Sequence, residues 1–159
     1  MSNTQIYEIY IKTTPQAVWD AITKPEWTQR YGYQGLASYE LRAGGAFRTH
    51  SPPQMRAMGL PDVVIDGEVI EVDPPHKLVH TYRFLFDDAM KSEGFTKITW
   101  EIAAAGQGFS RLTVTHELDG APIMAAMVAS KFSEQGTGGW TWILSDMKSV
   151  LETGSPLAA

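Results

Sequence analysis

Much of the chain alternates between hydrophobic and polar residues, which is typical of β-strands with one buried face. The alternation is clearest at residues 110–117, and an aromatic and β-branched segment near the N-terminus has the same character. The pair Gly44 and Gly45 separates two shorter segments as a tight turn would. The expected strands cover residues 6–11, 38–42, 46–49, 64–72, 77–86, 95–103 and 110–117.

The C-terminal part of the chain follows a helical period. Trp140, Leu144, Met147 and Leu151 recur at helical spacing, which predicts a long amphipathic helix with one broad apolar stripe. Glycine and proline just after Thr153 mark its end.

Shorter features lie between these elements. Two short helices are expected after the first strand, near residues 15–22 and 26–30, because a proline stands at the start of each. The proline-rich segment 51–61 is expected to be a loop or lid, and residues 87–94 are expected to connect two strands.

Together these elements predict an α+β fold. Short connections imply antiparallel neighbouring strands, and a single long apolar stripe must pack on a sheet. We therefore expect a curved antiparallel sheet wrapped around the C-terminal helix. A chain of 159 residues suffices for one hydrophobic core, so a single domain over residues 1–159 is expected, with an ordered core at about 6–152.

Composition narrows the chemistry. The chain has no cysteine, which excludes disulfides, thiolate metal sites and a cysteine nucleophile. Thirteen basic against eighteen acidic residues give a net charge of −5, the wrong sign for neutralising phosphates, so nucleic acid is not an expected partner. The N-terminus lacks a signal-peptide pattern and no stretch suits a membrane span. We expect a cytoplasmic protein without membrane insertion.

Six segments of the chain occur in an order that resembles a known superfamily. In combination they are similar to the START-like (SRPBCC) superfamily, and within it to bacterial relatives of the C-terminal domain of the heat-shock ATPase activator. The segments are PQAVWDAI at 15–22, LRAGGAFR at 41–48, GEV at 67–69, DPPHKLVHTY at 73–82, RLTVTHE at 111–117 and GWTWILSDMKSVLE at 139–152.

The resemblance implies a helix-grip fold with an interior cavity between the sheet and the terminal helix, used to hold an apolar small molecule. It implies no shared catalytic residues, because members range from lipid carriers to cyclases and co-chaperones. Fold alone does not fix function.

Alternation along the strands and the helical stripe place a set of large side chains toward such a cavity. Tight packing of a solid core is the alternative interpretation for each of them. The candidate ligand-binding residues are Trp27, Phe47, Met55, Met58, His80, Tyr82, Phe84, Trp100, His116, Met124, Met127, Trp140, Ile143, Leu144 and Met147.

Two pairs of these methionines stand on the lid segment and on residues 121–128, where flexible side chains can adapt to varied ligands or plug an empty cavity. Gly136, Gly138 and Gly139 follow the second pair. Three glycines are costly inside a helix, so we expect a hinge or break there.

His80 and His116 are the most specific polar candidates. If both face the cavity, they could hydrogen-bond a ligand or act as acid and base near neutral pH. A structural role for each histidine is the alternative. The sequence holds no metal-ligand spacing, no Gly-x-Ser-x-Gly motif and no phosphate-binding loop, so neither metal nor cofactor is expected.

Three functions follow as hypotheses. The first is binding of a hydrophobic small molecule, such as a lipid, for carriage, sequestration or sensing. The second is a cyclase or dehydratase acting on a polyketide-like or aromatic substrate, with His80 and His116 as the catalytic residues. The third is a co-chaperone-like interaction domain in the stress response, so a protein partner or homodimer stays open as well.

Overall fold

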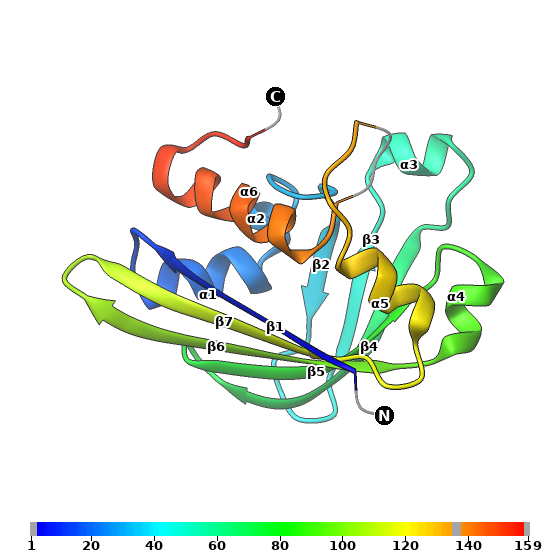
Figure 1. Cartoon of the computed structure of the whole chain (residues 1–159), viewed down its shortest axis with the longest axis horizontal. Coiled ribbons are helices and arrows are strands. Elements are labelled where there is room, and N and C mark those ends of the chain that lie inside the picture. Colours follow the sequence, from blue (N-terminus) through cyan, green and yellow to red (C-terminus); the bar gives the residue numbers. More distant parts are fainter. Residues whose placement is uncertain (1–2, 135–137, 158–159) are drawn as a thin grey trace.

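A seven-stranded antiparallel sheet forms one layer, and the helices lie on its concave side (Figure 1). The computed structural model describes residues 3–134 and 138–157. Strand order in the sheet is β1-β7-β6-β5-β4-β3-β2. The strands are β1 (Thr4–Ile11), β2 (Leu36–Tyr39), β3 (Ala46–His50), β4 (Val63–Asp73), β5 (Lys77–Phe84), β6 (Thr96–Gly106) and β7 (Phe109–Glu117).

Helices begin and end where the local sequence supplies the terminating groups. The Thr14 hydroxyl accepts a hydrogen bond from the backbone N–H of Ala17, which caps the first helix at its N-terminus. The last helix ends at Gly154, whose φ of 83° is left-handed and costs glycine little. The helices are α1 (Pro15–Thr23), α2 (Pro25–Thr28), α3 (Pro53–Ala57), α4 (Asp88–Glu93), α5 (Pro122–Val128) and α6 (Trp140–Thr153).

The predicted α+β helix-grip fold is confirmed. The prediction did not include two short helices, α3 within the expected loop or lid 51–61 and α4 within the connection 87–94. The local signals were a proline at the first turn of α3 and Asp87, which caps α4 by accepting from the backbone N–H of Met90. The first short strand also begins and ends earlier than expected, at Leu36–Tyr39.

The core lies between the concave face of the sheet and helices α1, α5 and α6. Leu78, Ile98 and Leu112, from three neighbouring strands, are fully buried. Leu144 and Met147 of α6 close the core from the other side. Alternation thus places the inward residues as expected, because side chains along a strand alternate between the two faces of the sheet.

The segment before α6 packs closely against the end of α5. A Cβ atom added at Gly139 would lie 2.1 Å from the Val128 carbonyl oxygen, so this position requires glycine. Helix α6 begins at the next residue, which agrees with an expected break. Gly136, another residue of the predicted hinge, lies outside the described residues.

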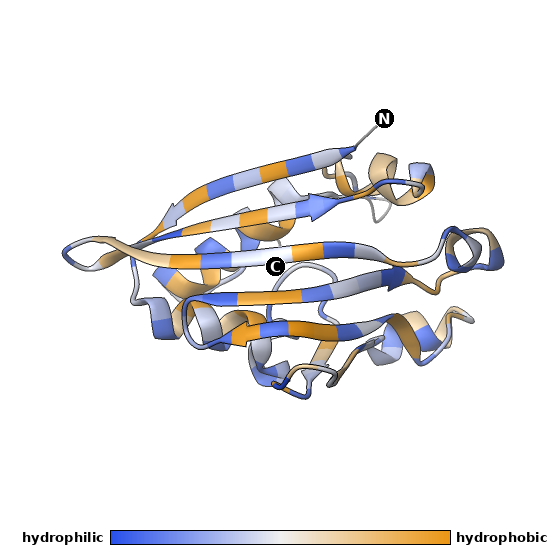
Figure 2. Ribbon diagram, turned by 90° about the horizontal axis from the view of Figure 1, so that it is seen from below, coloured by the Kyte–Doolittle hydropathy of each residue, from blue (hydrophilic) through white to orange (hydrophobic). Residues whose placement is uncertain are grey.

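Hydrophilic and hydrophobic residues alternate along the strands of the sheet (Figure 2), as expected when one face packs on the core and the other faces solvent. Asp66 and Arg83, on the neighbouring strands β4 and β5, form an ion pair of 2.7 Å. Among the described residues, no helix is both long and apolar enough to cross a bilayer.

Candidate functional site

An apolar cleft lies on the concave side of the sheet, between strands β2 to β6, α6 and the α3 segment. Its volume of about 130 Å³ is close to the roughly 150 Å³ of an apolar cavity that admits benzene. The walls are formed by Ile22, Thr28, Tyr31, Gly32, Tyr33, Gly35, Ala37, Tyr39, Phe47, Thr49, Pro52, Met55, Val64, Ile65, Tyr82, Phe86, Trp100, Trp140 and Ile143.

The cleft carries no charge on its walls. Aromatic and aliphatic side chains dominate the lining, and no acidic, basic or histidine side chain contributes to it within the described residues. Burying an ion in such surroundings without a partner is costly. The walls therefore favour a neutral guest.

Four tyrosines and two threonines, Thr28 and Thr49, bring hydroxyl groups to the cleft lining, and the tyrosines divide into two pairs. The hydroxyls of Tyr31 and Tyr33 donate to the carbonyl oxygens of Ala21, at 2.7 Å, and Gly138, at 2.6 Å. These two phenols thereby hold the 31–35 segment against α1 and the start of α6. The hydroxyl protons of Tyr31 and Tyr33 are therefore already engaged in hydrogen bonds to the backbone.

Tyr39 and Tyr82 form the other pair. Neither hydroxyl has a hydrogen-bond partner in the part of the chain that the structure describes. Every fully buried side-chain polar atom there does have a partner, so these two oxygens must be at least partly accessible. Burial of the rings raises the pKa of both phenols above its ordinary value of 10. Both hydroxyls are therefore protonated at neutral pH and free to donate.

The two candidate histidines point inward but lie beneath the aromatic walls, outside the cleft lining. Strand register places His80, Ile98 and His116 in one row across β5, β6 and β7. Both imidazoles are completely buried. Their chemistry depends on which groups surround each nitrogen.

His116 is fully hydrogen-bonded. The indole Nε1–H of Trp140 donates to Nδ1 at 3.0 Å, so Nε2 carries the proton and donates to the Thr96 hydroxyl at 2.8 Å. Thr96 in turn donates to the carbonyl oxygen of Tyr82. Burial, together with the neighbouring His80, lowers the pKa of His116 to about 3.

His80, like His116, has a hydrogen-bond partner at each ring nitrogen, but its proton is on Nδ1 instead of Nε2. Its Nδ1–H donates to the Thr81 carbonyl oxygen at 2.8 Å, and Nε2 accepts from the indole N–H of Trp100 at 3.0 Å. Burial lowers its pKa to about 4, although the Thr81 carbonyl raises it slightly. Both histidines are thus neutral at pH 7, and both nitrogens of each ring are occupied.

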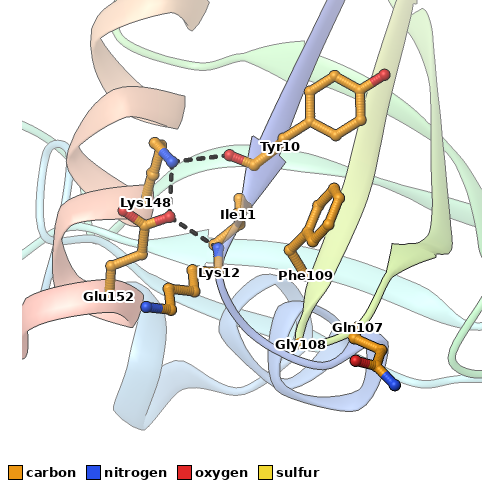
Figure 3. Close-up of a pocket in the computed structure, with 8 residues that line it drawn as sticks. All are labelled: Tyr10, Ile11, Lys12, Gln107, Gly108, Phe109, Lys148 and Glu152. Atoms are coloured by element: carbon orange, nitrogen blue, oxygen red, sulfur yellow. Dashed lines mark hydrogen bonds and ion pairs between the residues drawn. The ribbon is translucent and has the colours of Figure 1, made fainter.

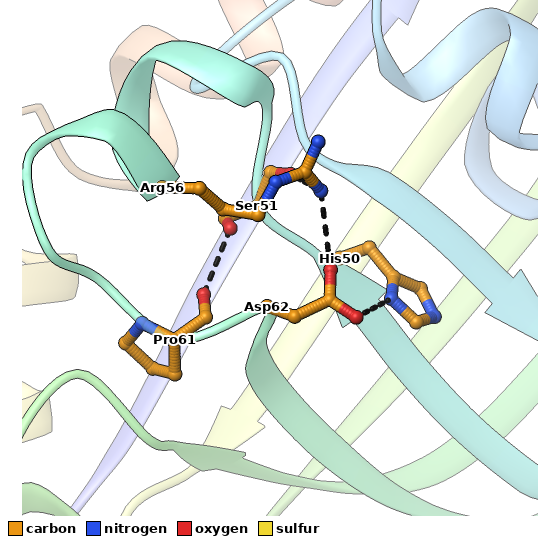
Figure 4. Close-up of polar contacts among 5 residues, drawn as sticks. All are labelled: His50, Ser51, Arg56, Pro61 and Asp62. Atoms are coloured by element: carbon orange, nitrogen blue, oxygen red, sulfur yellow. Dashed lines mark hydrogen bonds and ion pairs between the residues drawn. The ribbon is translucent and has the colours of Figure 1, made fainter.

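The α3 segment forms the rim of the cleft and is tied down at its base (Figure 4). The carboxylate of Asp62 accepts from the His50 ring at 3.2 Å and from Arg56 at 3.1 Å. These two contacts lower the pKa of Asp62. The hydroxyl of the buried Ser51 donates to the carbonyl oxygen of Pro61 at 2.8 Å.

A second pocket lies at the other end of the sheet, between β1, the β6–β7 turn and α6 (Figure 3). It is larger, at about 320 Å³, but it is an open surface groove. Two of its charged groups already pair with each other, since the Lys148 ammonium contacts Glu152 at 2.6 Å and also donates to the Tyr10 carbonyl oxygen at 2.8 Å. We therefore regard the smaller cleft as the candidate site.

The structure brings together some of the fifteen candidate residues and places the others elsewhere. Phe84, Met124, Leu144 and Met147 are core residues, and the two histidines lie beneath the walls. Trp27 packs under the Arg30 guanidinium, while Met58 is 81% exposed and Met127 lies at the surface. The candidates that line the cleft are Phe47, Met55, Tyr82, Trp100, Trp140 and Ile143.

Tyr31, Tyr33 and Tyr39 line the cleft but were not among the candidates. The available signal for Tyr39 was its i, i+2 spacing from Ala37 in a short strand, because both residues then face the same side. The described residues contain no group of acidic or histidine side chains arranged to hold a metal ion.

The sequence matches a known protein family over most of its length. Residues 12–152 match the family model described as activator of Hsp90 ATPase homolog 1-like protein. The chain belongs to this family. The resemblance expected from the six sequence segments is thereby confirmed. Among curated proteins no match was found.

Solved structures share the fold at low sequence identity. MLL2253 from Mesorhizobium loti is 18% identical with a TM-score of 0.68, over 94% of this chain and 96% of that one. PFC0360w, an HSP90 activator from Plasmodium falciparum, is 22% identical with a TM-score of 0.56, over 97% and 90%. CalU16 from Micromonospora echinospora is 17% identical with a TM-score of 0.54, over 73% of this chain; the match spans only 60% of CalU16.

Proposed function

We propose that the chain binds a small hydrophobic molecule in the cleft between the sheet, α3 and α6. The observation that carries the proposal is an uncharged, aromatic-walled cleft in which two of the four phenol hydroxyls have no partner among the described residues. Ligand sites typically combine a mostly apolar concave surface with a few polar groups that orient the ligand. A structural core would leave neither the space nor the free donors.

The size of the cleft limits what enters without movement. A volume of about 130 Å³ suits a single ring, whereas typical ligand pockets measure roughly 300–1,000 Å³. Larger molecules would have to displace α3, none of whose residues is buried. Met55 and Pro52 on this segment line the cleft, so its outward movement would enlarge the space directly.

The other two hypotheses have less support. Acid–base catalysis needs a histidine that contacts the substrate and exchanges a proton near neutral pH, and both imidazoles are covered, neutral and fully hydrogen-bonded. Hsp90 activation is stated for PFC0360w, whose likeness to this chain at 22% identity concerns the fold. No contact in the described residues favours either function.

Thermal unfolding in the presence of neutral aromatic and aliphatic compounds tests the proposal. A ligand that binds only the native state raises stability by about 2.7 kcal/mol at a hundred times its Kd. We expect single-ring aromatic compounds to raise the melting temperature of the protein. Failure of every compound to do so would contradict the proposal.

A matched pair of variants tests whether the stabilising compounds bind in the cleft. Ile143→Trp adds an indole at the cleft wall and should abolish the stabilisation by ligand. Thr141→Trp adds the same group to an exposed position of the same helix and should retain it. If both variants respond like the original protein, the compounds bind elsewhere.

A further inference from the structure

The partnerless hydroxyls of the cleft are held in a defined arrangement around one aromatic ring. The Tyr39 ring stacks on Phe47 with centroids 4.6 Å apart, and the Tyr82 ring stacks on Phe47 at 5.9 Å. Tyr39 and Phe47 are direct cross-strand partners on β2 and β3. Phe47 is itself almost completely buried, so it fixes both phenols.

Strand β4 lies between β3 and β5 and permits the close approach of the Tyr82 ring to the Phe47 ring. On β4, Gly67 is the register partner of Phe47. A Cβ atom at Gly67 would lie 2.0 Å from the Thr81 carbonyl oxygen, so no other residue fits without a backbone shift. The aromatic wall is therefore built on a position where glycine is required.

The same wall presents donors but no cation. Phenols are protonated at neutral pH, and burial raises the pKa of these two further above its ordinary value. The remaining tyrosines, Tyr31 and Tyr33, have committed their hydroxyls to backbone carbonyl oxygens. A guest with an acceptor oxygen finds two phenol donors, and a carboxylate finds no positive charge among the lining residues.

We infer that Tyr39 and Tyr82 are the polar recognition pair of the cleft, and that they select neutral aromatic molecules with a carbonyl or ether oxygen over hydrocarbons and carboxylates. The inference rests on the proposed function and specifies the ligand class. The flat aromatic walls favour a planar guest, and the volume favours a single ring.

Three single-ring compounds of similar size test this selection. Acetophenone carries a ketone, α-methylstyrene has the same shape with a methylene group in place of the oxygen, and benzoate carries a charge. Affinities are measured by NMR titration of the intact chain. In the unmodified protein we expect acetophenone to bind more tightly than benzoate by at least about tenfold, because benzoate must lose its hydration without gaining a cation.

The decisive quantity is the ratio of acetophenone affinity to α-methylstyrene affinity. One hydrogen bond contributes about two- to tenfold in binding, so the double variant Tyr39→Phe and Tyr82→Phe should lower this ratio by at least about threefold. Affinity for α-methylstyrene should stay within about twofold, because the rings and the cleft are unchanged. Tyr31→Phe is the matched control, since it removes a hydroxyl that already has a backbone partner in the same cleft.

The outcomes separate the two proposals. An unchanged ratio in the double variant, or an equal fall in the Tyr31→Phe control, overturns the recognition pair while leaving ligand binding intact. Benzoate binding as tightly as acetophenone also overturns it. If neither acetophenone nor α-methylstyrene binds the unmodified protein, the proposed function itself fails.

Discussion

Two groups of polar aromatic residues lie in the same interior. The histidine layer consists of His80 and His116 with their indole partners Trp100 and Trp140. The tyrosine pair of the cleft consists of Tyr39 and Tyr82. Every nitrogen of the two imidazoles has a hydrogen-bond partner, whereas neither phenol hydroxyl of the pair has one among the described residues. The difference shows which polar groups complete the fold and which are available to a guest. Buried polar groups are costly unless they are paired, so pairing indicates a structural role.

The largest expected loss of stability comes from a substitution in the histidine layer. His116→Ala leaves a cavity and removes the partners of Trp140 and Thr96, so we expect a loss of about 4 kcal/mol or more in the free energy of unfolding. Urea denaturation followed by circular dichroism measures it. A loss below about 1 kcal/mol would show that the network does not support the fold.

The pH dependence of stability is the next largest effect. Both histidines have folded-state pKa values, about 4 and about 3, below the ordinary 6.5, so the unfolded chain binds more protons between these values. Stability should be fully present above pH 6.5 and fall as the pH drops, by roughly 2 kcal/mol per histidine between pH 7 and pH 5.

Urea denaturation at a series of pH values measures this slope. The partly buried His50 and the exposed His76 provide the control, because the slope assigned to His80 and His116 should persist when both are replaced by glutamine. A flat profile between pH 7 and pH 5 in the original protein would contradict the neutral, buried assignment of the other two histidines.

Removing a single indole donor gives a smaller effect. Trp140→Phe leaves Nδ1 of His116 without its donor, which should cost about 1–3 kcal/mol in the free energy of unfolding. Trp142→Phe on the same helix is the matched control, because Trp142 packs at the surface against Tyr33 and Phe132. Equal losses in the two variants would mean that ring size matters and the hydrogen bond does not.

The tyrosine pair should show the smallest effect on stability. Tyr39→Phe and Tyr82→Phe each remove a hydroxyl without a partner, so the free energy of unfolding should change by no more than about 0.5 kcal/mol. Tyr31→Phe should cost more, because it removes the donor to the Ala21 carbonyl oxygen. A large loss for Tyr82→Phe would place its hydroxyl in the folding network.

The sequence predicts the sheet well because side-chain alternation in a strand is local. Leu78, His80, Leu112 and His116 could be assigned to the inner face from spacing alone, and all are buried. The partners of the histidines could not be assigned in this way. They depend on strand register, which sets Trp100 beside His80, and on the position of α6, and both arise from long-range packing.

The candidate site was harder to predict than the fold. The spacing of the methionines suggested flexible cavity walls, yet α5 turns Met124 into the core and Met127 toward solvent, and only Met55 reaches the cleft. Tyr39 stands at the end of a four-residue strand, too short for alternation to be distinctive. Whether a tyrosine hydroxyl is paired or free depends on the tertiary structure and cannot be seen in the sequence.

The central claim is that the cleft admits a guest and the histidine layer does not. Crystals of the protein soaked with bromobenzene test it directly, because bromine gives an anomalous signal at its position. We predict a bromine peak in van der Waals contact with Phe47 and Tyr82, with the Trp100–His80 and Trp140–His116 hydrogen bonds intact. A peak confined to the surface groove beside Tyr10 and Phe109, with none in the cleft, would contradict the account.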